Sequence, residues 1–86
     1  MNTPPPPAVV LTRRDAQRNM ARFYAVEVQE DLFGGGVLVR RWGRIGTQGR
    51  ECRQWFALRG AAEAECALWL HRKARRGYID SGPPEA

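Results

Sequence analysis

The spacing of apolar residues changes once along this chain, and this change restricts the fold more than any other feature. Between Arg22 and Ala57, apolar and polar residues alternate in runs that glycine-rich turns interrupt, which is typical of half-buried β-strands. After Gly60, apolar residues recur every three or four positions, as on one face of an α-helix. This order predicts an α+β fold, in which a small antiparallel β-meander carries one C-terminal helix on one of its faces.

The predicted strands cover residues 22–29, 37–45 and 51–57, with an additional short edge strand at 9–12. Glycine turns at 34–36 and 46–49 permit the positive φ that reversals between antiparallel strands require. Alternation puts Tyr24 on the face shared with Val26 and Val28. It also puts Arg40, Trp42 and Arg44 together on one face of their strand, although alternation alone does not say which face is buried.

The helix is predicted over residues 61–76, and Gly77 follows as a stop. The stripe expected on its inner face consists of Ala62, Cys66, Trp69, Leu70 and Lys73. We expect Trp69 and Trp55 in the core, because large aromatic residues dominate the packing of small domains. Proline-rich tails are expected at residues 1–7 and 81–86, so one domain is predicted over 8–80.

A chain of 86 residues has room for a single small core, which disfavours a deep catalytic cleft and favours binding on an outer face. Cys52, Cys66 and His71 do not supply a zinc quartet, so we expect neither a metal nor a cofactor. No activated nucleophile or acid pair stands out, and an enzyme is not expected. The start of the chain has no secretory signal pattern and no apolar run spans a membrane, so a cytoplasmic protein is predicted.

The charge balance favours a phosphate-rich partner. The chain has 14 Lys and Arg against 9 Asp and Glu, for a net charge of +5, and all the bases except Lys73 are arginines. The guanidinium group suits bidentate contacts with phosphate. A high arginine content also fits a genome rich in GC, so the charge indicates a kind of partner without identifying it.

Trp42 is the strongest candidate for a contact residue. Arg40, Arg41 and Arg44 flank it, and the glycines around it leave room for a ligand, so the ring can stack on a base or sugar while the cations reach phosphate. The alternative is that Trp42 is a core residue. The basic run at residues 71–76 is either a phosphate clamp or a solvated helix end.

Several segments in order resemble one known family, the WGR domain. They are Asn-Met-Ala-Arg-Phe-Tyr at 19–24, Asp-Leu-Phe-Gly at 31–34, Trp-Gly-Arg-Ile-Gly at 42–46, Gly49, and residues 73–78. The family's fold is a small antiparallel sheet with one helix, which agrees with the pattern above. The polymerase members have Asn-Lys-Phe-Tyr where this chain has Ala-Arg-Phe-Tyr, and in this respect the chain looks like stand-alone bacterial members.

In DNA-dependent poly(ADP-ribose) polymerases this domain binds DNA near a break. The resemblance implies that Trp42 packs on the sugar at a strand end and that Arg44 serves either the 5′ phosphate or a neighbouring domain. It further implies that Lys73, ahead of the aromatic Tyr78, touches the DNA backbone, and that Asn19 contacts a phosphate.

Residues and resemblance together predict a non-catalytic module that binds DNA ends or nicks, with no membrane and no small-molecule substrate. The first alternative is an adaptor that uses Arg44 and the basic helix end to bind an acidic protein. The second is a small structural or toxin-associated protein. The candidate contact residues are Trp42, Arg44, Arg40, Lys73, Asn19, Arg41, Arg53 and Tyr78.

Overall fold

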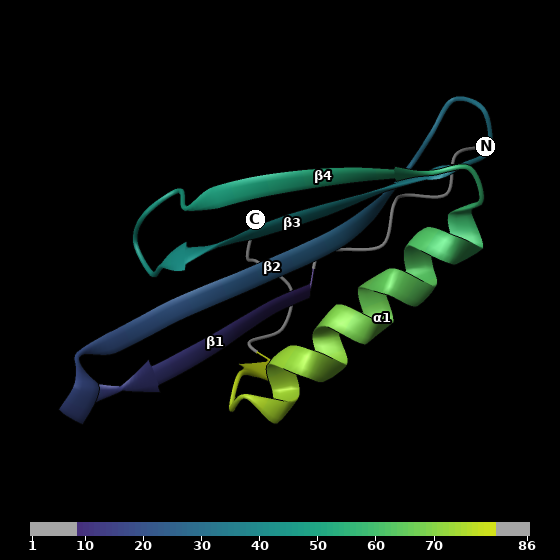
Figure 1. Ribbon diagram of the computed structural model, residues 1–86. Helices are drawn as coiled ribbons and strands as arrows, with labels where there is room; N and C mark the ends of the chain where they lie inside the picture. The colour runs from purple at the N-terminus through teal and green to yellow at the C-terminus, as the bar shows by residue number, and fades with distance from the viewer. Residues whose placement is uncertain (1–8, 81–86) are drawn as a thin grey trace.

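The computed structural model of the chain describes residues 9–80, which form a five-stranded antiparallel sheet with one long helix along one face (Figure 1). The spatial order β4-β3-β2-β1-β5 puts β1 to β4 side by side in sequence order, with β5 returning to pair with β1, so the predicted α+β meander is confirmed. The predicted tails at 1–7 and 81–86 lie outside the described residues. The elements are β1 (Val9–Asp15), a 3-10 turn (Ala16–Arg18), β2 (Met20–Glu30), β3 (Gly36–Arg44), β4 (Arg50–Phe56), α1 (Arg59–Arg75) and β5 (Ile79–Asp80).

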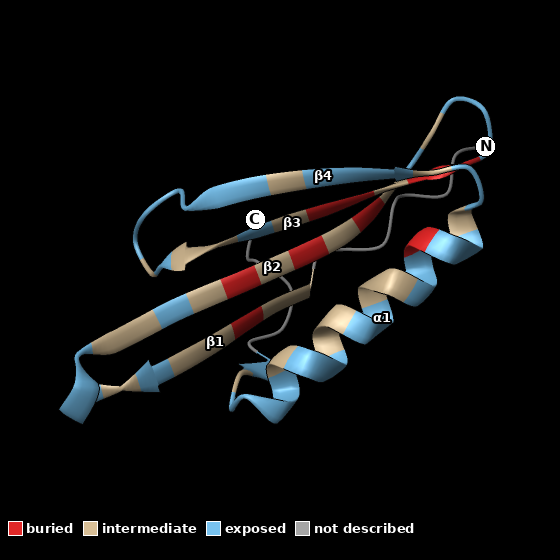
Figure 2. Cartoon of the chain, in the orientation of Figure 1, coloured by how far each residue is buried: buried red, intermediate tan, exposed pale blue. Residues whose placement is uncertain are grey.

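The register decides which side of each strand faces the helix. Leu11 pairs with Tyr24, which in turn pairs with Trp42, so this row of side chains points toward α1. Tyr24 is buried together with Val26 and Val28, so the grouping predicted from alternation is confirmed. Buried residues lie along the middle of β1 and β2, on β3 and near the start of α1 (Figure 2). The core cluster consists of Leu11, Tyr24, Val26, Val28, Leu38 and Ala62.

Helix α1 approaches the sheet most closely at its first turns. A Cβ added to Gly36 would lie 2.9 Å from the Cβ of Ala62, which is fully buried. Farther along, Cys66, Trp69 and Leu70 pack against the core, so the predicted stripe is confirmed. Because Gly36 and Ala62 are small, the helix packs close to the sheet at this point. The larger side chains farther along α1 fill the space between the helix and the sheet.

The first strand is not the edge strand that the sequence predicted. It extends to Asp15 and pairs with β2 on one side and with β5 on the other. The chain reverses after α1 at Gly77, whose φ is +92°, and Ile79 then pairs with Thr12. A strand of two residues has no alternation to detect, so the sequence pattern could not reveal this pairing.

The prediction that Trp55 lies in the core is wrong. Strand β4 is at the edge of the sheet, and the register puts Trp55 opposite Val37, on the face away from α1. The indole is 60% exposed, and its Nε1 donates a hydrogen bond to Asp31 Oδ2 at 2.6 Å. Trp69, the other tryptophan expected in the core, is half-buried and packs against it.

Candidate nucleic-acid interface

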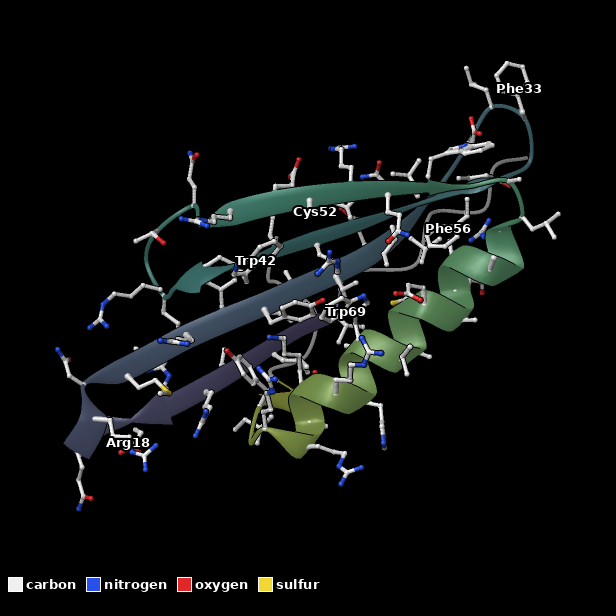
Figure 3. The ribbon with its side chains drawn as sticks, in the orientation of Figure 1. Arg18, Phe33, Trp42, Cys52, Phe56 and Trp69 are labelled. Atoms are coloured by element: carbon white, nitrogen blue, oxygen red, sulfur yellow. The ribbon has the colours of Figure 1, made fainter. Side chains whose placement is uncertain are left out.

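A pocket of about 470 Å³ brings together five of the predicted contact residues, namely Asn19, Trp42, Arg44, Lys73 and Tyr78. They come from the start of β2, the end of β3 and the end of α1, which meet at one end of the molecule. In Figure 3, Arg18 and Trp42 lie toward this end, and Phe33 marks the opposite end. The side chains were predicted from separate parts of the sequence, and the fold makes them neighbours.

Arg44 is held in place by Asn19. Asn19 has a left-handed backbone conformation, with φ of 50°, and ends the short 3-10 turn between β1 and β2. This conformation is one that asparagine adopts more readily than most residues. Its backbone oxygen and its Oδ1 accept hydrogen bonds from the Arg44 guanidinium at 3.2 and 3.4 Å. Arg44 remains exposed, so the guanidinium is oriented and still reachable.

Arg40 lies behind Trp42 and does not line the pocket. Its guanidinium carbon lies 5.5 Å from the centre of the Trp42 ring and 4.1 Å from that of Trp69, and one of its nitrogens donates to Cys52 Sγ at 3.4 Å. Figure 3 shows Trp69 between α1 and the sheet. Arg40 therefore links the two indoles by cation–π contacts and supports the back of Trp42. Trp42 itself is half-buried, so it packs on the core and also lines the pocket.

Lys73 sits between two aromatic rings at the edge of the pocket. Its Nζ lies 4.9 Å from the centre of the Tyr24 ring and 5.3 Å from that of Tyr78. Partial burial lowers the pKa of the Lys73 ammonium below its ordinary value of 10.5, and the positive charges of Arg76, Arg40 and Arg22 lower it further. The free protein thus holds a cation at a place where positive charge is already concentrated.

A second hollow, of about 530 Å³, continues the positive surface along the last turns of α1. It shares Lys73 with the first pocket and is lined also by Trp69, Arg72, Arg75 and Arg76. The Arg72 guanidinium lies 5.2 Å from the centre of the Trp69 ring. The basic run that the sequence left open as a clamp or a solvated helix end thus borders the Trp42 pocket.

Two arginines of the pocket were missed by sequence reasoning. Arg22 pairs across the sheet with Arg44, and Arg18 belongs to the 3-10 turn. The register of β2 against β3 would have identified Arg22, since alternation already put it on the face of Tyr24. No sequence pattern identified Arg18 as a pocket residue, because nothing in the sequence predicts a 3-10 turn there.

The fold separates Arg41 and Arg53 from this pocket. Both lie on the face of the sheet away from α1, as their positions next to the helix-facing Arg40 and Cys52 require. Arg53 also contacts Glu51 at 3.0 Å and Gln29 at 3.4 Å. These two predicted contact residues therefore do not line the pocket around Trp42.

The described side chains around the pocket are cationic, aromatic or neutral. No carboxylate of the described chain lines either the pocket or the neighbouring hollow. Across residues 9–80, no three His, Cys, Asp or Glu side chains gather as metal ligands. In the same residues, no helix is long and apolar enough to cross a membrane.

Comparison with known proteins gives one relative and one family for this chain. The chain is 40% identical over 73 residues to the uncharacterized protein y4dW of Sinorhizobium fredii, an alignment that covers 85% of this chain and 36% of that protein. The chain thus spans about a third of the length of this relative. No solved structure matches this chain significantly. Residues 8–85 match the model of the WGR domain, and this protein therefore belongs to the WGR domain family.

Proposed function

We propose that this protein is a non-catalytic module that binds DNA at a strand end or nick. Trp42 packs on the terminal nucleotide, and the cations around it contact the adjoining phosphates. The observation that carries the proposal is the pocket in which Arg44 and Lys73 flank the half-buried indole and which no described carboxylate lines. An indole that lines a pocket can pack on a sugar or a base of any sequence, as end recognition requires.

The electrostatics of the pocket favour a phosphate ligand. The lowered pKa of Lys73 means that its charged form is disfavoured in the free protein, and a neighbouring phosphate would remove this cost. Arg44 is already oriented by Asn19, so it loses little freedom when it binds. Arg40 acts in this proposal as a positioning residue, because its guanidinium supports the Trp42 ring from behind.

The hollow along α1 extends the proposed site. Since Lys73 lines both hollows, a nucleic-acid backbone that leaves the Trp42 pocket can continue past Arg72 and Arg76. Phosphate contacts of this kind add affinity without sequence preference. The proposed module therefore recognises a terminus by its shape and charge.

The experiment is a fluorescence anisotropy titration with blunt, nicked and single-stranded DNA at low and physiological salt. Removal of a stacking side chain costs about 1–3 kcal/mol, so we expect Trp42→Ala to weaken binding about 5- to 150-fold. Trp42→Leu keeps an apolar side chain against the core and should lose nearly as much affinity for DNA. Trp55→Ala is the matched control, because it removes an indole from the opposite face.

Circular dichroism of each variant must show that the fold is retained. Binding that prefers ends or nicks, and that depends on Trp42 and not on Trp55, supports the proposal. Equal binding to all three DNAs with no dependence on Trp42 would reduce it to general electrostatic attraction. An absence of binding at low salt would favour the adaptor, in which Arg44 and the basic end of α1 bind an acidic protein.

A further inference from the structure

The face of the sheet away from α1, here called the open face, is apolar at its centre. An antiparallel sheet with one solvated face normally carries polar side chains there. In this sheet Val10, Phe23, Ala25, Val39 and Ile45 instead line a hollow of about 400 Å³. Helix α1 lies against the other face (Figure 1). Helix α1 therefore does not cover this centre, where Val39 is only 4% exposed and the other four apolar side chains are half-buried.

Two exposed arginines, Arg14 and Arg41, line the same hollow. Neither forms an ion pair or a side-chain hydrogen bond with another residue among 9–80. Glu27 also lines the hollow and accepts a hydrogen bond from Gln29 at 3.2 Å, and Glu51 pairs with Arg53 at 3.0 Å, but neither carboxylate forms an ion pair with Arg14 or Arg41. The open face thus combines an apolar centre with two arginines that have no ion-pair partner among residues 9–80.

We propose that the open face docks an amphipathic segment of another protein, whose apolar side chains fill the hollow and whose carboxylates pair with Arg14 and Arg41. Arginine suits this role because its guanidinium pairs with a carboxylate through two parallel hydrogen bonds and is weakly hydrated. Burial of the apolar centre supplies the affinity, and the two arginines select an acidic partner.

Charge argues against two other occupants. A second copy of this chain would bring its own Arg14 and Arg41 to the interface, and like charges oppose association. The segment 1–8 carries no acidic residue, so it cannot compensate either arginine. An acidic segment from a different protein satisfies both the apolar and the charged parts of the face.

This inference does not depend on DNA binding, because Trp42 and the two open-face arginines lie on opposite faces of the sheet, and the two hollows share only Phe23 among their lining residues. Trp42 and Arg41 are neighbours in β3 and point to opposite sides. A partner on the open face would leave the Trp42 pocket accessible. The domain could then hold a nucleic acid on one face and a protein on the other.

The test uses two synthetic peptides of about 14 residues, enough for four helical turns. Both have the same leucine stripe, which glutamates flank in one peptide and lysines in the other. Two-dimensional ¹H–¹⁵N NMR titration of the full chain locates binding, and calorimetry measures affinity. We expect the acidic peptide to shift the amide signals of Val10, Ala25 and Ile45, and to bind about tenfold more tightly than the basic one.

The double variant Arg14→Glu/Arg41→Glu should reverse this preference for the acidic peptide. Its matched control, Arg75→Glu/Arg76→Glu, makes the same change in net charge at the C-terminal end of α1 and should preserve the preference. The proposal is overturned by equal affinity for the two peptides, by no binding up to about 1 mM, or by signal shifts centred on Trp42. Self-association of the chain through the open face in analytical ultracentrifugation would overturn it as well.

Discussion

Two glycines in the turn after β3 differ in what a methyl group would meet. Both have positive φ, +95° at Gly46 and +70° at Gly49. A Cβ on Gly46 would meet nothing within 4 Å, whereas a Cβ on Gly49 would overlap the carbonyl oxygen of Trp42. A left-handed backbone costs an ordinary residue about 1–2 kcal/mol, so we expect this loss of unfolding free energy in Gly46→Ala.

Gly49→Ala should cost more than Gly46→Ala, about 3 kcal/mol or more, because steric overlap adds to the backbone strain. Urea unfolding of the two variants measures the difference. The comparison also concerns the site, since the backbone that Gly49 contacts belongs to Trp42. Equal losses in the two variants would mean that the turn relaxes freely and does not fix the position of the tryptophan.

Lys73 should make DNA binding sensitive to alkaline pH. Its pKa in the folded protein lies below 10.5, so between that lowered pKa and 10.5 the unfolded chain holds more protons, and stability contributed by Lys73 rises with pH. DNA binding has the opposite dependence, because a phosphate favours the protonated form. Affinity should therefore fall as pH rises through the lowered pKa.

Lys73→Arg is the control for this pH dependence, since arginine stays charged throughout the range. Anisotropy titrations from neutral pH to 10.5 should show affinity falling at a lower pH in the unmodified protein than in the variant. Parallel curves would indicate that Lys73 does not contact the DNA. Circular dichroism across the range excludes unfolding as the cause.

The contact between α1 and the sheet depends on a small residue at Ala62. It is fully buried, and Gly36 faces it across the interface. Ala62→Leu should therefore lower the unfolding free energy by about 1–3 kcal/mol, as overpacking does in close-packed cores. Ala64→Leu makes the same change at an exposed position of the same helix and should stay within about 0.5 kcal/mol of the original. Urea unfolding distinguishes the two, and similar losses would mean that the interface yields to the larger side chain.

The elements that could be predicted are those whose pattern is local. The alternation around Tyr24 and the stripe that includes Trp69 each extend over several residues, so the pattern identified both elements, the grouping of Tyr24 with Val26 and Val28, and the inner face of the helix. Strand β5 exists only through its pairing with β1, and two residues carry no pattern. Trp55 was misplaced for a similar reason, because its exposure follows from the position of β4 at the edge of the sheet.

At the scale of the whole molecule, the candidate site was predictable in part. The sequence pointed to Trp42 and its cationic neighbours, but it could not decide which of these side chains lie on the face of the sheet that α1 covers. Alternation separates Arg41 from Trp42, and strand pairing extends that separation to Arg53. The register also brings in Arg22, which composition alone did not single out.

The cations lie on two faces of the sheet, so we expect substitutions on the two faces to change the salt dependence of DNA binding by different amounts. If the Trp42 face neutralises about four phosphates, log K should fall with log[salt] at a slope of about −3 to −4. Arg44→Gln and Lys73→Gln should each reduce that slope by about 1, because each removes one cation from the pocket. Arg53→Gln removes the same charge from the open face, where Arg53 pairs with Glu51, and should leave the slope unchanged. Anisotropy titrations over a series of salt concentrations give the slopes. If all three variants reduced the slope equally, DNA would be responding to net charge alone, and the Trp42 pocket would not be the binding site.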